Sequence, residues 1–130
     1  LDPEDALMAV KLGYDGIVVS NHGGRQLDGA LSSIMALPEI VDKVDSKLEV
    51  YIDGGIMSGQ DLCKALCIGA NGALIGRAFL YGLGAYGKQG VVKCLEIIRD
   101  SLDETIAFLG EADVQKLDRD NIILKNFYGN

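Results

Sequence analysis

Residues 16–29 read Gly-Ile-Val-Val-Ser-Asn-His-Gly-Gly-Arg-Gln-Leu-Asp-Gly, a short apolar run followed by a polar loop rich in glycine. The β-branched residues predict a strand over 16–20 that leads straight into this loop. The loop holds His22, the one histidine of the sequence, and Arg25 follows three positions later. An imidazole can take a proton near neutral pH, and a guanidinium can hold a carboxylate through two parallel hydrogen bonds. The pair therefore suggests proton abstraction from a small substrate that carries a carboxylate.

Helices and strands are predicted to alternate on both sides of this loop. Asp2 can cap a first helix that begins at Pro3, and Pro38 either splits the helix after the loop or starts its main segment. The last helix carries an apolar stripe that includes Val92 and Leu95. This alternation indicates parallel α/β structure, and a doubly wound sheet and a TIM barrel both produce it. The predicted helices cover 3–12, 33–44, 59–68, 79–85 and 90–109, and the predicted strands cover 16–20, 48–53 and 73–76.

The composition argues against several classes of protein. A formal net charge of -7 disfavours a general nucleic-acid binder, which needs a basic surface. Cys63 and Cys67 lie one helical turn apart without a histidine or a third cysteine nearby, so we expect buried thiols and no metal site. No apolar run reaches the roughly 20 residues of a membrane span. The cysteine pattern fits a reducing cytoplasm, and peripheral membrane association of the full-length protein stays open.

The stretch Ser20–Gly29 resembles the histidine loop of the FMN-dependent α-hydroxy acid dehydrogenase and oxidase family, which includes glycolate oxidase, L-lactate dehydrogenase and mandelate dehydrogenase. Ten residues with few free choices make this motif far more specific than a lone glycine pattern. The continuation over 30–33 and 36–38 is most similar to the bacterial L-lactate dehydrogenase branch. The resemblance implies FMN as cofactor and oxidation of an L-2-hydroxy acid, L-lactate on this branch, to the 2-oxo acid.

The resemblance also assigns roles to the two charged residues of the loop. It implies that His22 is the active-site base, which takes a proton from the substrate as two electrons pass to the flavin. It implies that Arg25 binds the substrate carboxylate. Without the motif, His22 would be read as a loop histidine satisfied by hydrogen bonds and Arg25 as a solvated cation. The acid that orients the family's histidine, and a lysine that approaches the flavin, come from earlier strands and are not in this sequence.

Two further loops resemble the flavin-binding elements of the family. The first follows the penultimate strand, where glycines let backbone N–H groups approach a phosphate and an acid contacts the ribityl chain. The second follows the last strand and is a second phosphate element. A Gly-Gly turn between a strand and a helix is common by itself, so this assignment depends on the neighbouring histidine loop. Methionine departs from the family at position 57, where an arginine usually reaches the FMN phosphate. The residues assigned to the flavin are Asp53, Gly54, Gly55, Met57, Gly76 and Arg77.

The family decides between the two folds in favour of the TIM (β/α)8 barrel. It maps residues 1–110 onto the last helix and strand units of the barrel and leaves 111–130 as a C-terminal tail. Active residues then lie at the C-terminal ends of strands. Only about three of the eight strands are present, and a free three-stranded sheet would expose two edges and an apolar face. We therefore expect an incomplete barrel domain from a longer gene, or a chain that assembles with another.

Two functions remain for this sequence. The first is the FMN-dependent 2-hydroxy acid oxidoreductase, which in full-length form is implied to be a homo-oligomer; oxygen, a quinone and a cytochrome are all open as its electron acceptor. The alternative is a truncated or remnant barrel fragment without independent catalytic activity. A type-2 isopentenyl diphosphate isomerase shares the late glycine loops, but it is not expected to carry Ser20–Gly29 in this form.

Overall fold

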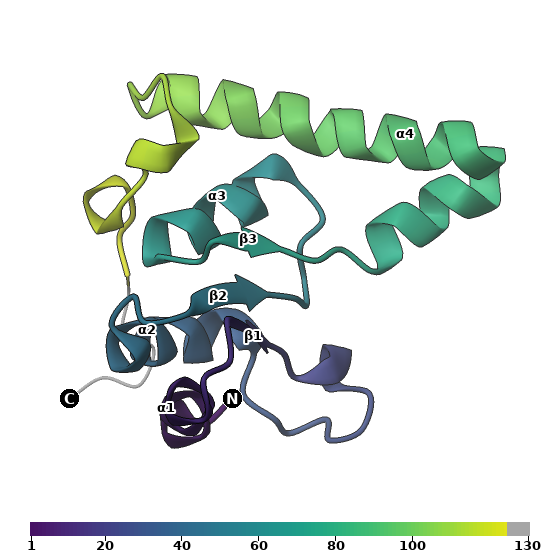
Figure 1. Ribbon diagram of the computed structural model, residues 1–130. Coiled ribbons are helices and arrows are strands. Elements are labelled where there is room, and N and C mark those ends of the chain that lie inside the picture. The colour runs from purple at the N-terminus through teal and green to yellow at the C-terminus, as the bar shows by residue number, and fades with distance from the viewer. Residues whose placement is uncertain (125–130) are drawn as a thin grey trace.

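The structure is a computed structural model that describes residues 1–124, so positions 125–130 of the predicted tail lie outside the described residues. Figure 1 shows a small sheet with helices packed beside it and a long, bent helix along one side. The elements in chain order are α1 (Pro3–Leu12), β1 (Gly16–Val19), a 3-10 turn η1 (His22–Gly24), α2 (Ser33–Val44), β2 (Glu49–Ile52), α3 (Gly59–Ile68), β3 (Gly72–Ala73), α4 (Arg77–Phe108) and the 3-10 turns η2 (Val114–Lys116) and η3 (Arg119–Asn121).

The three strands form one parallel sheet in the order β1-β2-β3. Val18 pairs with Tyr51, and Ile52 pairs with Ala73. This arrangement confirms the predicted parallel α/β structure. The last strand is shorter than the predicted 73–76, because the chain leaves the sheet after Leu74 donates its N–H to the Ile52 carbonyl at 2.8 Å.

One face of the sheet forms the core. Val19, Val50 and Ile52 are at most 2% exposed and pack with residues of α2 and α3, including Leu37 and Ile40. Side chains alternate across a strand, so Val18 points to the opposite face, where it is 47% exposed. On that face the Tyr51 hydroxyl donates to Glu49 at 2.8 Å, and this hydrogen bond raises the pKa of Tyr51. The sheet is therefore covered by helices on one side and open on the other in the part of the chain that the structure describes.

Local signals place the ends of the helices. Asp2 caps α1 by accepting from the Glu4 N–H, and Ser58 caps α3 by accepting from the Asp61 N–H. Gly13 and Gly69 end these helices in the left-handed conformation that glycine adopts without a steric cost. Pro38 lies inside α2, which continues through it as one helix.

The two predicted helices at the end of the regular part appear as the two arms of α4. The helical geometry breaks at Tyr86 and Gly87, and the chain folds back there (Figure 1). The arms approach closely where Gly82 meets Gly90, because a Cβ at Gly90 would lie 1.8 Å from the Gly82 carbonyl oxygen. The longer arm packs on α3 (Figure 1). No helix within residues 1–124 combines the length and the apolar character needed to span a membrane.

Candidate functional site

A hollow of about 550 Å³ lies where the three strands end, between the loops that follow them. Each strand contributes one loop to its lining, which matches the position expected for an active site in parallel α/β folds. Every residue predicted for the site except His22 contributes to this lining. The lining residues are Gly23, Arg25, Asp53, Gly54, Gly55, Ile56, Met57, Leu74, Ile75, Gly76, Arg77 and Leu80.

The loop after β1 contains three consecutive residues in the left-handed region. The φ angles of His22, Gly23 and Gly24 are 53°, 65° and 68°. Glycine adopts this conformation readily, whereas a residue with a Cβ pays about 1–2 kcal/mol. The Ser20 hydroxyl accepts the His22 N–H at 3.0 Å and helps to hold the histidine in it. The double glycine thus serves a tight left-handed turn that begins at His22.

The two charged residues of this loop are placed differently. Arg25 follows the turn, where its N–H donates to the His22 carbonyl at 3.3 Å, and it lines the hollow. His22 is exposed and does not contribute to the lining. The turn therefore brings Arg25 to the predicted flavin loops, whereas His22 lies outside the lining of the hollow.

Asp53 presents a buried hydrogen-bond acceptor to the site. Its Oδ1 atom is buried and has no hydrogen-bond partner among the described residues. Gly54 and Gly55 follow with φ angles of 84° and 81°, and a Cβ at Gly55 would meet no atom within 4 Å. A buried carboxylate oxygen without a partner is costly unless a ligand donates to it. The turn therefore fits a ligand that carries hydroxyl donors, such as the ribityl chain of a flavin nucleotide.

The loop after β3 supplies a cation at the start of a helix. Arg77 is the first residue of α4, where a positive charge is unfavourable against the helix dipole, and the free N–H groups of the first turn point outward. A Cβ at Gly76 would meet no atom within 4 Å, so the backbone there is open to approach. Two arginines and one aspartate line the hollow, which favours an anion. These features fit the phosphate group of a nucleotide.

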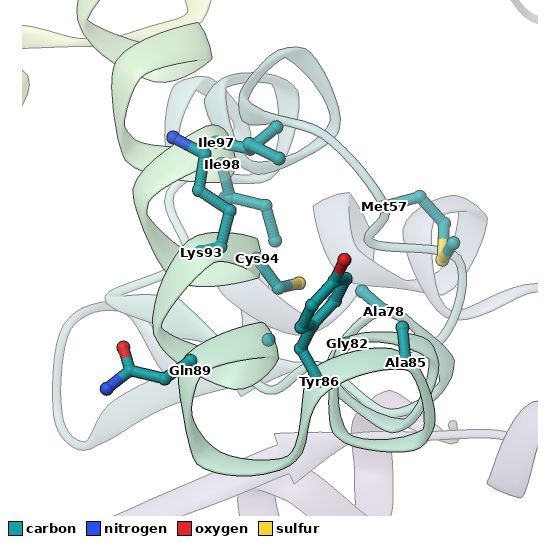
Figure 2. A pocket seen from close by; sticks show the side chains of 11 residues that line it. Met57, Ala78, Gly82, Ala85, Tyr86, Gln89, Lys93, Cys94, Ile97 and Ile98 are labelled. Carbon is teal, nitrogen blue, oxygen red and sulfur yellow. The ribbon is translucent and has the colours of Figure 1, made fainter.

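Met57 joins this hollow to a second one. Its N–H donates to Asp61 at 3.2 Å, and its side chain, 46% exposed, lines both hollows. The second hollow has a volume of about 510 Å³ and lies between the two arms of α4, lined mainly by apolar side chains including Ile97 and Ile98 (Figure 2). Met57 is the one predicted site residue that it contains. A methionine side chain offers no hydrogen-bond donor, so it adds nothing to anion binding.

The cysteines and the acidic residues form no metal site in the described residues. No group of three or more His, Cys, Asp or Glu side chains is close enough there to hold a metal ion. Cys63 and Cys67 are buried with their Sγ atoms 4.0 Å apart, as the sequence predicted for core thiols.

Two polar residues beside the site were not predicted. Ser33 and Asn21 lie next to Gly54 and connect the loop after β1 to the start of α2. Asn21 lies within the histidine motif, but its side chain was given no task. Ser33 gave no signal, because a serine near a helix start is commonplace.

Known proteins of one family are similar to this chain in sequence and in structure. A family model described as FMN-dependent dehydrogenase matches residues 1–124. An L-lactate dehydrogenase of Caulobacter sp. (strain K31) is 50% identical over 119 residues, which are 92% of this chain and 31% of that protein. A structure of mandelate oxidase with benzoyl-formic acid is 43% identical with a TM-score of 0.82, and the match covers 91% of this chain and 34% of that one.

A mandelate oxidase mutant with the monooxide FMN adduct matches equally well, with 43% identity and a TM-score of 0.82 over 91% of this chain and 36% of that one. The chain therefore spans about a third of the length of these relatives. The likeness confirms the predicted fold class, since the three parallel strands and their helices match part of a TIM-barrel oxidase.

Proposed function

We propose that this chain, which belongs to the FMN-dependent dehydrogenase family, forms one wall of an active site. The complete site would oxidise an L-2-hydroxy acid to the 2-oxo acid. The observation that carries this proposal is the hollow at the strand ends, where Arg25 meets the Asp53–Gly55 turn and the Gly76–Arg77 turn. L-lactate is the substrate we favour, because the relative from Caulobacter sp. is an L-lactate dehydrogenase with 50% identity. The mandelate oxidase structures support the wider class of 2-hydroxy acids.

The residues of the second and third loops would hold FMN. Asp53 would accept from the ribityl hydroxyls, since its buried Oδ1 has no partner within the described residues. Gly55 and Gly76 leave room for backbone N–H groups to approach the phosphate, and Arg77 would pair with its charge. When bound, FMN supplies a two-electron acceptor.

The loop after β1 would handle the substrate. Arg25 would bind the carboxylate through two parallel hydrogen bonds and so orient the carbon that carries the hydroxyl group. An imidazole nitrogen of His22 would take the proton that leaves the substrate. The left-handed backbone at His22 supports this role, because such conformations concentrate at functional sites, where the surrounding structure holds them.

A second candidate is that the 130-residue chain has no catalytic activity by itself. The open face of the sheet favours this candidate, since Val18 and Leu74 are each 47% exposed. The chain covers 31% of the Caulobacter sp. protein, so the unmatched part of that protein is about twice as long as the matched part. Under this candidate the wall described above needs a second wall before it can act.

Reconstitution separates the two candidates. The chain would be purified alone and together with the part of the Caulobacter sp. L-lactate dehydrogenase that it does not match, and flavin absorbance and L-lactate turnover would be measured for both. Flavin and turnover in the chain alone would eliminate the second candidate. Flavin and turnover only in the joined form would support the second candidate for the isolated chain. Absence of flavin from both would contradict the proposed cofactor.

His22→Ala tests the proposed base in whichever form is active. We expect turnover to fall by about two to four orders of magnitude, the range typical for general acid–base catalysis, while bound flavin stays the same. Because His22 does not line the hollow, its loss should leave the flavin residues in place. Unchanged turnover would refute the role of His22.

The three free cysteines support a reducing compartment, so we propose the cytoplasm as the location of the whole protein. We also propose that the whole protein is a homo-oligomer.

A further inference from the structure

Ser33 is a buried hydroxyl at the junction of two loops of the site. It is the first residue of α2 and is 3% exposed, the one fully buried polar residue found between positions 1 and 124. Burying a hydroxyl is unfavourable unless it forms hydrogen bonds. Ser32, directly before it, occupies the capping position of α2, and its side chain forms no capping hydrogen bond. Capping the helix therefore does not explain why the hydroxyl of Ser33 is buried.

The contacts of Ser33 reach away from its own helix. Its Oγ accepts the backbone N–H of Asn21 at 3.3 Å, across twelve positions of sequence. The same Oγ would lie 3.3 Å from a Cβ at Gly54. Ser33 thus contacts the residue that precedes His22 and also the turn that follows Asp53.

Asn21 completes this junction. Its side-chain Nδ2 donates to the Leu31 carbonyl at 3.3 Å, and its Oδ1 would lie 3.5 Å from a Cβ at Gly54. The amide group therefore ties the two ends of the loop over 21–31 and lies beside the same turn as Ser33. Gly54 itself is exposed, but both side chains lie on the side where its Cβ would project, so their positions and the path of the turn are linked.

We propose that Ser33, together with Asn21, is a positioning residue that sets where the His22 and Arg25 loop lies relative to the Asp53–Gly55 turn. The inference deepens the proposed function and rests on it. The hydroxyl fixes the first N–H of the loop, and the left-handed turn from His22 to Gly24 follows immediately. If this N–H loses its acceptor, the loop is free to shift, and Arg25 then meets a substrate carboxylate less well.

The single histidine provides a direct probe, because its imidazole gives one set of NMR signals. Pyruvate would be titrated in the presence of FMN into the form that binds flavin in the reconstitution, with only the 130-residue chain isotopically labelled, and its Kd would be read from the shift of these signals. We expect Ser33→Ala to weaken pyruvate binding roughly fivefold to tenfold, since a buried N–H is left without its acceptor. Ser32→Ala is the matched control and should leave the Kd unchanged. Ser33→Thr keeps the oxygen and should restore most of the binding.

The outcomes are distinct. Pyruvate binding in Ser33→Ala equal to that in the unmodified chain would overturn the inference and leave the proposed function intact. A lower melting temperature with the same pyruvate Kd would overturn it too, because it would show a purely structural role. No pyruvate response in an unmodified form that binds flavin would contradict the carboxylate clamp, and this inference with it. If Ser33→Ala does not fold, Asn21→Ala replaces it, and unchanged pyruvate binding in that variant would likewise overturn the inference.

Discussion

His22 has a φ of 53°, and this angle places it at the start of a left-handed turn that an ordinary side chain resists. The Ser20 hydroxyl holds its N–H, and two glycines continue the turn. The sequence shows the glycines, but it does not show that the histidine itself takes this conformation, because the cost at His22 is met by contacts of the folded loop. Arg25 then comes to the hollow as a consequence of the turn.

Met57 gives the sharpest prediction for a single residue. Its side chain lines the same hollow as Arg77 and brings no donor to it. We expect Met57→Arg to strengthen FMN binding by about tenfold or more, because one charge-assisted hydrogen bond to a phosphate contributes about 1.5–3 kcal/mol. Quenching of FMN fluorescence measures the Kd.

Met57→Leu is the control for this change, since it keeps an apolar side chain of similar size at the same position. It should bind FMN like the unmodified chain. An arginine that leaves the Kd of FMN unchanged would show that position 57 does not reach the phosphate. An equal gain for riboflavin, which has no phosphate, would show that the new charge acts elsewhere.

At the scale of elements, the close packing of α3 against α4 depends on Gly59. A Cβ at Gly59 would lie 2.0 Å from the Leu102 nitrogen and 2.6 Å from the Ile98 carbonyl oxygen, both backbone atoms of α4. Backbone atoms cannot move aside as the end of a side chain can, so Gly59 sets how closely the two helices approach. Ser58, which caps α3, directly precedes this contact in the sequence.

Gly59→Ala should therefore lower the free energy of unfolding by about 1–3 kcal/mol, the usual range for overpacking. Gly84→Ala is the matched control, because Gly84 also lies in a helix and a Cβ there would meet nothing within 4 Å. That change should raise the free energy of unfolding by about 0.5–1 kcal/mol through helix propensity. Urea denaturation followed by circular dichroism measures both. Equal effects of the two substitutions would contradict the close packing at Gly59.

These elements show what the sequence can and cannot predict. The cap at Asp2 was predicted because it depends on a residue only two positions away. The contact of Gly59 with α4 was not, since its partners lie far along the chain. The apolar stripe of the last helix was predicted, but Val92 and Leu95 are 42% and 52% exposed because which members of a stripe are buried depends on the neighbouring element.

For the whole molecule, the segment after α4 links α2 and α3 on the helical side of the sheet. The Arg119 guanidinium donates to the Asp42 carboxylate on α2, with a shortest distance of 2.7 Å, and to the carbonyls of Pro38 and Ile68 at 3.4 Å. The turns beside it place Leu117 on the buried pair Cys63 and Cys67. This strap (residues 114–122) was not predicted, because its partners are tens of positions away and one arginine among acids has no local pattern. Most residues that line the hollow at the strand ends were named from the sequence, because motifs of neighbouring residues carry them, and their roles stay predictions.

The strap predicts how the buried thiols react. Burial, and then the neighbouring Cys63, raise the pKa of Cys67 to about 12 from an ordinary value of 9.0, so the reactive thiolate is scarce at pH 8. Arg119→Ala removes the hydrogen bonds that fasten the strap. Since the ion pair between Arg119 and Asp42 is partly exposed, we expect the free energy that holds the strap closed to fall by about 1 kcal/mol. Labelling of Cys63 and Cys67 should then be roughly fivefold faster.

Labelling at pH 8 with a thiol reagent, followed by mass spectrometry, measures the rate at each cysteine. Cys94 is half-buried on α4, away from the strap, and serves as the internal control whose rate should not change. Arg119→Lys keeps the charge but not the planar fork of donors, so its labelling rates should lie between those of the unmodified chain and those of Arg119→Ala. The folded chain holds the Cys67 proton more tightly than the unfolded chain, so the free energy of unfolding should fall as the pH rises from 9 toward 12. Arg119→Ala should reduce this fall in the free energy of unfolding, because a strap that opens more often returns the Cys67 thiol to water. Identical labelling rates and identical pH dependence in Arg119→Ala and the unmodified chain would show that the strap does not protect the thiols.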